Sequence, residues 1–209
     1  MRIAGSNPAA LTFFLAIKIE SVKLSYMTNS PRIEAAKEFA RIAHAKQFRR
    51  DGARPYFVHL EDTARRVAAV TDDEDMIMAA VLHDISEDQG VTVEELTEFF
   101  GVRVAGLVDE LTDQFEKAKY PDWNRKERKR RERERYGAIS DDAALIKLCD
   151  IAENLKDRDI DDKRFIIMFT KEKELCLPFL RRENDSRNAS AYEVAMEELE
   201  KAKKELDIK

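Results

Sequence analysis

Four polar side chains follow directly on an apolar run in the stretch AAVLHDISED, residues 79–88. They are His83, Asp84, Glu87 and Asp88, and no glycine or proline interrupts the stretch, which predicts one continuous helix. At about 100° per residue, the four side chains then fall within an arc of roughly 140° on one side of that helix. An imidazole beside a carboxylate suits a divalent cation, because nitrogen and oxygen ligands bind such ions at similar distances. A helix that merely leaves the core for solvent is the alternative, and four groups this close together make it the less favoured interpretation.

A metal site on this stretch needs further ligands from elsewhere in the chain. The sequence holds three histidines, so His44 and His59 are the remaining candidates for an imidazole ligand. Asp150 ends a second apolar run, LIKLCDIAENL, and Asn154 follows one helical turn later. Because this run also delivers a carboxylate from an apolar helix, Asp150 is the candidate for an additional carboxylate ligand.

Three blocks of the sequence occur in an order known from one family. They read HAKQFRRDGARPYFVHL, which contains His59, then LHDISED with His83 and Asp84, then KLCDIAEN with Asp150. In this order they resemble the HD-domain metal phosphohydrolases, and more narrowly the small alarmone hydrolases related to RelA and SpoT. Members of that group read HxxQxRKDGxPYxxHP, LHDxxED and KLADxxxN. The resemblance covers roughly residues 33–180 and implies a helical HD-domain bundle with metal-dependent phosphohydrolase activity.

The resemblance implies that one divalent cation is held by four side chains, those of His59, His83, Asp84 and Asp150. Oxygen-rich ligation without a thiolate favours manganese, with zinc, iron and cobalt as alternatives. Such a cation would acidify a bound water and neutralise the charge that develops on a phosphoryl group. The resemblance further implies that Glu87 and Asp88 orient this water and move protons. His44 corresponds to a family position that is not a ligand, so we expect it to support the site structurally.

The substrate implied by the resemblance is guanosine 3′,5′-bispyrophosphate or its triphosphate relative, cleaved at the 3′ position to release pyrophosphate. The candidate substrate-binding residues are Arg49, Arg50, Lys147 and Asn154, and guanidinium groups bind phosphate oxygens in a bidentate manner. Another phosphorylated nucleotide, such as NADPH or a nucleoside phosphate, is the alternative substrate. A degenerate domain used only for binding is a third interpretation, and the presence of all four ligands and both acidic residues argues against it.

Some positions depart from the family pattern. Leu60 stands where a proline usually follows the histidine, and Glu153 stands where alarmone hydrolases commonly carry an aromatic residue or histidine. The basic loop is one residue longer, with Ala53 and Arg54, so we expect a reshaped rim of the pocket. Cys149 precedes Asp150 in place of an alanine, and we expect it to be a small core residue.

The composition favours a single helical domain. Of 209 residues, 44% are hydrophobic and 38% are charged, with 6 glycines and 5 prolines, which predicts long helices and not a β-sandwich. The net charge of −5 argues against general affinity for nucleic acid. The two cysteines lack CxxC spacing, which argues against a zinc ribbon and fits a reducing cytoplasm. We therefore expect an all-α, cytoplasmic protein that binds a phosphorylated nucleotide, and neither nucleic acid nor membrane.

The first clear helix start is Ser30, an N-cap residue followed by Pro31. We expect residues 30–209 to form the domain, with helices over 31–48, 60–70 and 101–111 and a capping box from Thr92 to Glu95. Two further helices, near residues 163–180 and 191–206, are expected only to pack. Residues 1–29 form an extension whose apolar patch, ALTFFLAI, is too short to span a membrane, with Met27 as an alternative start. An arm that packs on the domain or on a second subunit stays open, and so does a homo-oligomer.

A basic run, NRKERKRRERER, covers residues 124–135 with eight basic and three acidic side chains. Most such runs are solvated helices. Its place between the second and third family blocks allows another role, because a basic helix over the pocket would attract a polyphosphate. Binding of nucleic acid is less favoured, since the run contains no interleaved aromatic residues. The first two interpretations stay open.

Overall fold

The computed structural model describes residues 30–156 and 162–208. The expectations for residues 1–29, an extension and a start at Met27, lie outside the described residues. The described part is helical, with one isolated bridge between Phe48 and Pro55 and no strand of a sheet. Its helices are α2 (Pro31–Ala43), α3 (Phe57–Ala68), α4 (Glu74–Leu82), α5 (Ile85–Gln89), α6 (Val93–Phe100), α7 (Val102–Leu111), α8 (Arg125–Tyr136), α9 (Asp141–Lys156), α10 (Lys163–Leu180) and α11 (Ser186–Leu206). The all-α prediction is confirmed.

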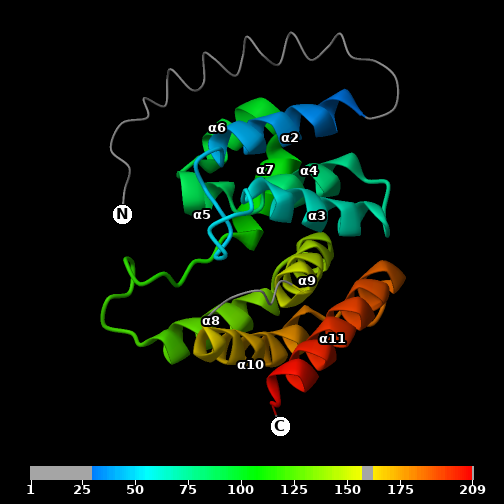
Figure 1. Cartoon of the computed structure of the whole chain (residues 1–209). Coiled ribbons are helices and arrows are strands. Elements are labelled where there is room, and N and C mark those ends of the chain that lie inside the picture. The colour runs from blue at the N-terminus through cyan, green and yellow to red at the C-terminus, as the bar shows by residue number, and fades with distance from the viewer. Residues whose placement is uncertain (1–29, 157–161, 209) are drawn as a thin grey trace.

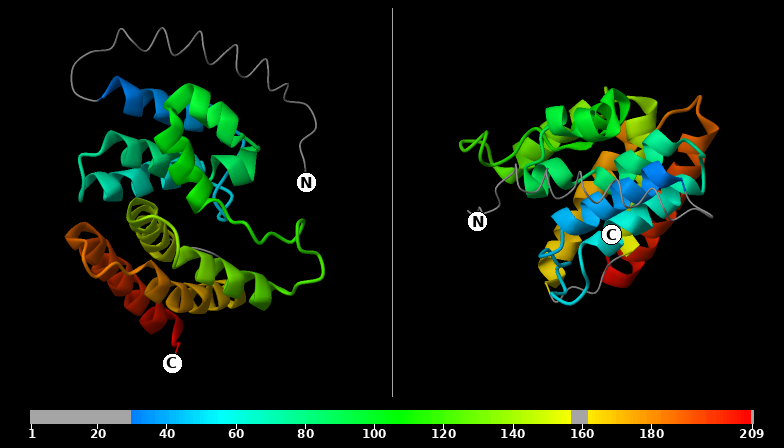
Figure 2. Two further views of the ribbon diagram at one scale, coloured as in Figure 1. Left: turned by 180° about the vertical axis from the view of Figure 1, so that it is seen from behind. Right: turned by 90° about the horizontal axis from the view of Figure 1, so that it is seen from above.

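Helix α9 lies between two groups of helices (Figure 1). It packs against α3, α4 and α7 on one side and against α10 and α11 on the other. Its residues from Ala143 to Glu153 are all buried, which explains why this segment is mostly apolar, with Lys147, Asp150 and Glu153 as its buried polar residues. Helix α4 is likewise buried from Met76 to Leu82. The view from behind shows the same two groups, with α10 and α11 on the far side of α9 from α2 (Figure 2). Both buried helices carry polar side chains of the predicted site.

The continuous helix predicted over residues 79–88 is wrong. Helix α4 ends at Leu82, and a turn at His83 and Asp84 separates it from α5, which begins at Ile85. Asp84 leaves helical geometry, with φ −99° and ψ 2°, while its carboxylate accepts a hydrogen bond from the hydroxyl of Tyr56 at 2.5 Å. The segment contains no glycine or proline before Gly90, so the turn could not be read from helix-breaking residues. Helix α5 ends at Gln89 and is capped by Gly90, whose φ of +71° favours glycine.

The first helix is shorter than predicted, because α2 ends at Ala43 and not at Phe48. After α2, the ring of His44 stacks on Tyr56 and a loop over residues 49–54 returns the chain to α3, which begins at Phe57 and not at residue 60. Ser30 precedes Pro31 at the start of α2 but makes no capping bond with its side chain. The capping box of α6 and the helices α7 and α8 are confirmed.

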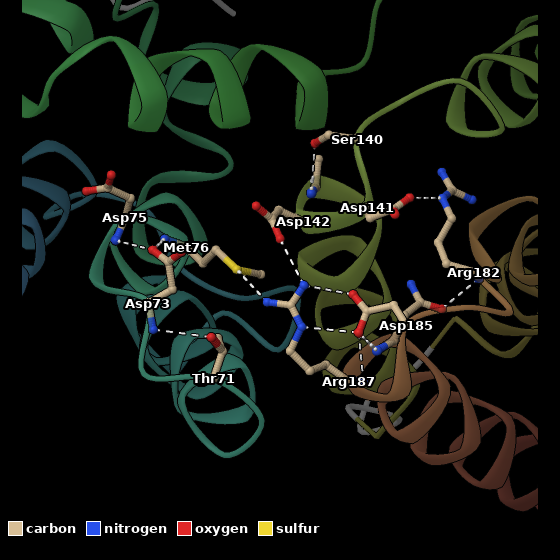
Figure 3. A network of polar contacts seen from close by, with 12 residues as sticks. Thr71, Asp73, Asp75, Met76, Ser140, Asp141, Asp142, Arg182, Asp185 and Arg187 are labelled. Atoms are coloured by element: carbon tan, nitrogen blue, oxygen red, sulfur yellow. Dashed lines mark hydrogen bonds and ion pairs between the residues drawn. The ribbon is translucent and has the colours of Figure 1, made fainter.

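A polar network fixes the N-terminal ends of three helices, α4, α9 and α11 (Figure 3). Arg187 in the first turn of α11 bonds Asp185 at 2.8 Å and Asp142 of α9 at 3.3 Å. Arg103 of α7 bonds Asp73, the N-cap residue of α4, at 2.7 Å, and the same Asp142 at 2.9 Å. The network thus ties the start of α4 to the start of α9. Both helices carry site residues toward their opposite ends.

Candidate active site

Three buried side chains from separate parts of the chain converge at the turn between α4 and α5. They are His59 of α3, His83 after α4 and Asp150 of α9, each 3% exposed or less. The Nε2 atoms of His59 and His83 lie 3.2 Å and 3.5 Å from Oδ1 of Asp150. One ligand atom from each of the three lies within 4.8 Å of the others. Oδ2 of Asp84 lies 3.1 Å from Nε2 of His83 and 3.9 Å from Nε2 of His59, so the four predicted ligands form one cluster.

The two histidines are arranged as ligands of a cation would be. Nδ1 of His83 lies 2.8 Å from the carbonyl oxygen of Ala80, and an Nδ1–H donated there leaves the Nε2 lone pair directed at the cluster. Nε2 of His59 and Nε2 of His83 are buried and form no hydrogen bond within the described residues. Buried nitrogens without a partner are costly unless another ligand satisfies them. The donor set of two imidazoles and two carboxylates fits a divalent cation.

Both candidate carboxylate ligands are held in the ionised form. Burial acts against the charge of Asp150, but Lys147 and the two histidines outweigh burial and keep its pKa well below the usual range. Burial likewise opposes ionisation of Asp84, and His83 lowers its pKa nonetheless. The same carboxylates raise the pKa of His83, against the effect of its own burial. A cation at this site would therefore compete with a proton on His83.

A second set of side chains orients these carboxylates. Lys147 places Nζ 3.0 Å from Oδ2 of Asp150, and Asn154 donates from Nδ2 to Oδ1 of the same residue at 2.6 Å. In this structure, Lys147 and Asn154, which the sequence indicated as substrate contacts, therefore bind a candidate metal ligand. Tyr56 orients Asp84 and was not predicted as part of the site. Its position three residues before His59 in PYFVH places it on the same side of the chain, which is the pattern that could have indicated it.

Two cavities lie beside this centre. Asp84 itself lines the small one, whereas the large one is lined by Tyr56 and Asn154, which bond Asp84 and Asp150. The large cavity has a volume of about 400 Å³ and includes Arg49, Arg50, Tyr56, Asp88, Asn154 and Phe165 in its lining. The small cavity has a volume of about 100 Å³ and includes Asp84, Glu87, Arg133, Lys147, Phe169 and Lys173. A volume of several hundred Å³ suits an organic ligand such as a nucleoside, whereas about 100 Å³ suits only a small group.

The large cavity combines basic and aromatic side chains. The guanidinium of Arg50 lies 3.7 Å from the centre of the Phe165 ring, and Arg49 donates to Oδ1 of Asn154 at 3.1 Å. Phe169 stacks on Phe165 with ring centres 6.0 Å apart. Both phenylalanines come from α10, so the expectation that this helix only packs is wrong. Their apolar spacing is the same as that of core residues, which is why this cavity could not be predicted from the sequence.

The two candidate catalytic carboxylates occupy different surroundings. The carboxylate of Glu87 accepts the backbone N–H of Asp113, and partial removal from water, followed by the charge of Asp113, raises the pKa of Glu87 to about 7. Asp88 accepts a hydrogen bond from Gln47 at 2.7 Å, and partial burial raises its pKa. Gln47 is in turn bonded to Nδ1 of His44 at 2.7 Å. His44 therefore lies behind Asp88 as a supporting residue.

Of the residues that depart from the family pattern, Arg54 of the longer loop lines the large cavity, whereas Leu60, Cys149 and Glu153 do not. Leu60 is fully buried in the core, and the thiol of Cys149 is also buried. The carboxylate of Glu153 pairs with Arg66 of α3 and with Lys156 at 3.3 Å. Glu153 lines a separate hollow of only about 30 Å³. The aromatic surface absent at position 153 is present instead on α10.

The basic helix α8 is divided between two surroundings. Three of its basic residues, Arg125, Lys129 and Arg133, line the small cavity. Arg130 and Arg131 pair with Glu127 of the same helix on an exposed side. One face of α8 is therefore a solvated charged surface, and the other borders the centre.

The chain shares its fold and much of its sequence with known hydrolases. A guanosine-3′,5′-bis(diphosphate) 3′-pyrophosphohydrolase of Drosophila melanogaster, MESH1, is 37% identical over 127 residues, which are 59% of this chain and 68% of that protein. The Homo sapiens MESH1 protein is 38% identical over 129 residues, 60% of this chain and 68% of its own length. A protein of the same enzyme name from Aquifex aeolicus is 36% identical over 140 residues, and the match spans only 19% of its length.

A solved structure described as a metazoan ortholog of SpoT that hydrolyzes ppGpp superimposes with a TM-score of 0.68 at 26% sequence identity. The superposition covers 88% of this chain and the whole of that one. The family model described as "HD domain" matches residues 36–164, a span that contains the histidine and aspartate cluster and both carboxylates of α5. The sequence, the fold and the position of the cluster therefore agree, and this chain belongs to the HD domain family.

Proposed function

We propose that this chain is a metal-dependent phosphohydrolase that cleaves guanosine 3′,5′-bispyrophosphate, or its triphosphate relative, at the 3′ position. The products would be intact pyrophosphate and guanosine 5′-diphosphate, or guanosine 5′-triphosphate from the triphosphate relative. The observation that carries the proposal is the buried cluster of His59, His83, Asp84 and Asp150 between a cavity of nucleoside size and a small cavity with basic side chains. The names of the relatives support the same substrate.

The residues of the cluster would hold one divalent cation, and we propose manganese because the ligands are imidazoles and carboxylates without a thiolate. When bound, such a cation supplies positive charge that acidifies a water and stabilises the transition state of phosphoryl transfer. Lys147 and Asn154 would keep Asp150 in a fixed orientation for that role. Tyr56 would do the same for Asp84.

We assign the two proton transfers to Glu87 and Asp88. A water oxygen forms a bond to the phosphorus attached to the ribose 3′ oxygen, and the bond from that phosphorus to the 3′ oxygen breaks. Glu87 takes a proton from the water, for which a pKa of about 7 is well suited. Asp88 gives a proton to the 3′ oxygen as it leaves, since it faces the cavity that would hold the nucleoside. Glu87 thus acts on the attacking water and Asp88 on the leaving oxygen.

The nucleoside would occupy the large cavity. Arg50 and Phe165 form a flat cationic and aromatic surface against which a base would stack, and Arg49 with Asn154 would contact the sugar and the 5′ phosphates. We further propose a cytoplasmic site of action, because both cysteines are free and buried thiols. No helix in the described ranges has the length and apolar character needed to cross a bilayer. Residues 30–209 would form the catalytic domain.

The test is a panel of phosphorylated nucleotides offered to purified, manganese-loaded protein. Guanosine 3′,5′-bispyrophosphate should release pyrophosphate, while NADPH and simple nucleoside phosphates should react at least about tenfold more slowly in kcat/KM. Asp150→Asn, which removes a ligand but keeps the side-chain shape, is the matched inactive control. Release of orthophosphate from NADPH or a nucleoside phosphate, with no pyrophosphate from the bispyrophosphate, would assign the chain to the alternative substrate class.

A further inference from the structure

The small cavity is lined by five basic and five acidic side chains, and most of the basic ones already have a carboxylate partner. Two of the carboxylates have close partners: Arg125 donates two hydrogen bonds to Glu172, at 2.7 Å and 2.8 Å, and Lys129 lies 2.6 Å from Asp113. Asp113 also accepts a bond from the hydroxyl of Tyr136 at 2.8 Å. These charges are therefore already neutralised within the protein.

The third acidic side chain on this wall is also satisfied. Glu132 accepts the backbone N–H groups of Gln114 and Phe115, at 3.0 Å and 3.1 Å, and pairs with Arg135. Glu132 is buried, so these bonds hold it in place. It is consequently not a counter-ion for another basic residue of the cavity.

Two basic residues of the same lining, Lys173 and Arg133, make no hydrogen bond or ion pair within residues 30–156 and 162–208. Nζ of Lys173 lies over the ring of Phe169, 4.9 Å from its centre. Withdrawal from water, and then the charge of Lys147, lowers the pKa of Lys173. An ammonium group in these surroundings is unfavourable until an anion pairs with it. Lys173 and Arg133 are therefore the side chains of this cavity with which a bound anion would pair.

Helix α10 presents this lysine toward the reacting centre. Phe169, Lys173 and Cys176 follow one another at helical spacing and line the small cavity. Asp84 and Lys147, which line the same cavity, lie 3.1 Å from His83 and 3.0 Å from Asp150, respectively. If a phosphoryl group is held at the cluster, a second phosphate attached to it would therefore lie between the cluster and Lys173.

We propose that the small cavity is a subsite for the distal phosphate of a diphosphate group, with Lys173 and Arg133 as the residues that bind it. This inference rests on the proposed phosphohydrolase function and adds a basis for selectivity to it. The phosphate next to the scissile bond lies at the cluster, and the second phosphate, which is not cleaved, occupies the small cavity. The subsite therefore selects substrates that end in a pyrophosphate over those that end in a single phosphate.

The first experiment compares two substrates, guanosine 3′,5′-bispyrophosphate and guanosine 5′-diphosphate 3′-monophosphate, which lacks only the distal 3′ phosphate. Lys173→Met keeps the length of the side chain and removes its charge. It should lower kcat/KM for the bispyrophosphate by about 10- to 100-fold, the effect of one charge-assisted hydrogen bond, and change that for the monophosphate less than about twofold. Arg133→Gln should act in the same direction, and Lys173→Arg should retain the preference.

Lys171→Met is the matched control, because Lys171 is an exposed lysine two positions away on the same helix. It should leave both substrates unaffected. Equal losses on both substrates in Lys173→Met would overturn the subsite and indicate a general effect on the active site, and unchanged selectivity would overturn it as well. Thermal melting of each variant identifies any loss of activity that is caused by unfolding. If Lys173→Met unfolds, the substrate preferences of Lys173→Arg and Arg133→Gln test the subsite.

A binding measurement separates this inference from the proposed reaction. By calorimetry, inorganic pyrophosphate should bind the metal-loaded protein at least about tenfold more tightly than orthophosphate, and Lys173→Met should abolish the difference. If this holds but the bispyrophosphate is not hydrolysed, the subsite stands and the proposed substrate fails. If the bispyrophosphate is hydrolysed but pyrophosphate and orthophosphate bind alike, the subsite is wrong and the proposed substrate stands.

Discussion

Glu87 and Asp88 are adjacent in the sequence, yet their carboxylates line different cavities. Glu87 faces the small cavity together with Asp84, and Asp88 faces the large cavity together with Tyr56 and Asn154. The turn at residues 83–84 makes this possible, because it allows α5 to diverge from α4 between the two spaces. Two carboxyl groups on opposite sides of a scissile bond can serve different proton transfers.

We predict that Glu87→Gln and Asp88→Asn retain the metal but lose turnover. Each change keeps the shape of the side chain and removes the group that takes or gives a proton, so kcat should fall by roughly 100-fold or more. Metal content by mass spectrometry and kcat under saturating substrate are the two measurements. Wild-type turnover in either variant would remove that carboxyl from the reaction.

The pH dependence should follow Glu87. Its pKa is raised to about 7, and a carboxyl accepts a proton only when ionised. Asp88 has to be protonated for its own step, so two ionisations overlap in the wild-type profile. In Asp88→Asn, which has no carboxyl at that position, the residual turnover should rise as pH increases through about 7 and level off above it. The residual activity of Glu87→Gln should lack this rise. A profile of Asp88→Asn that falls across the same interval would assign Glu87 the opposite role, as a proton donor.

Loss of any ligand should weaken metal binding. His59→Ala, His83→Ala and Asp150→Ala should each lower the affinity for manganese by at least about 100-fold, more than loss of a supporting residue around a metal usually costs. Equilibrium dialysis measures the affinity, and Asp109→Asn, on an exposed position of α7, is the control with an unchanged value. Full occupancy in one of the three variants would exclude that residue from the site.

Arg50→Ala should affect binding more than turnover. Arg50 stacks on Phe165 in the large cavity, away from the cluster, and would contact substrate and transition state alike. KM for the bispyrophosphate should rise about tenfold while kcat changes less than about threefold. Arg65→Ala, which removes an exposed arginine of α3, should leave both unchanged. An equal fall of kcat and kcat/KM would indicate that Arg50 contacts the transition state and not the bound substrate.

The network between α4 and α9 should contribute to stability. Arg103→Ala removes the bonds to Asp73 and Asp142 and leaves two carboxylates near helix N-termini without that partner. Because these side chains are partly exposed, the free energy of unfolding should fall by only about 1 kcal/mol. Urea denaturation measures it, with Arg65→Ala as a control of unchanged stability. A fall as small as that of the control would show that the network makes no net contribution to the free energy of unfolding.

Much of the fold follows from the sequence, because composition and helical spacing are local properties. The capping box at Thr92 and the basic helix α8 are read directly from a few adjacent residues. The turn at His83 and Asp84 is different. No glycine or proline stands there, and Asp84 contacts Tyr56, 28 positions earlier in the chain, a contact that adjacent residues do not reveal.

In the candidate site, too, some features could be predicted from the sequence and others could not. The four metal-ligand candidates were identifiable from the motif blocks, and the structure brings them together. The role of α10 was not identifiable, because Phe165 and Phe169 follow the same period as core residues while lining a cavity. Lys173 was also missed, since a single lysine in a helix gives no indication that it lacks a partner. Whether a side chain lines a cavity or lacks a partner depends on helices that are distant in the sequence.

Hydrolysis of guanosine 3′,5′-bispyrophosphate in water enriched in oxygen-18 tests the central claim most directly. Manganese-loaded protein should yield equimolar guanosine diphosphate and pyrophosphate on anion-exchange chromatography, with the heavy oxygen in the pyrophosphate alone, because water attacks phosphorus. Asp150→Asn should yield neither product. Release of orthophosphate in place of pyrophosphate, or heavy oxygen in the guanosine diphosphate, would contradict the proposed reaction.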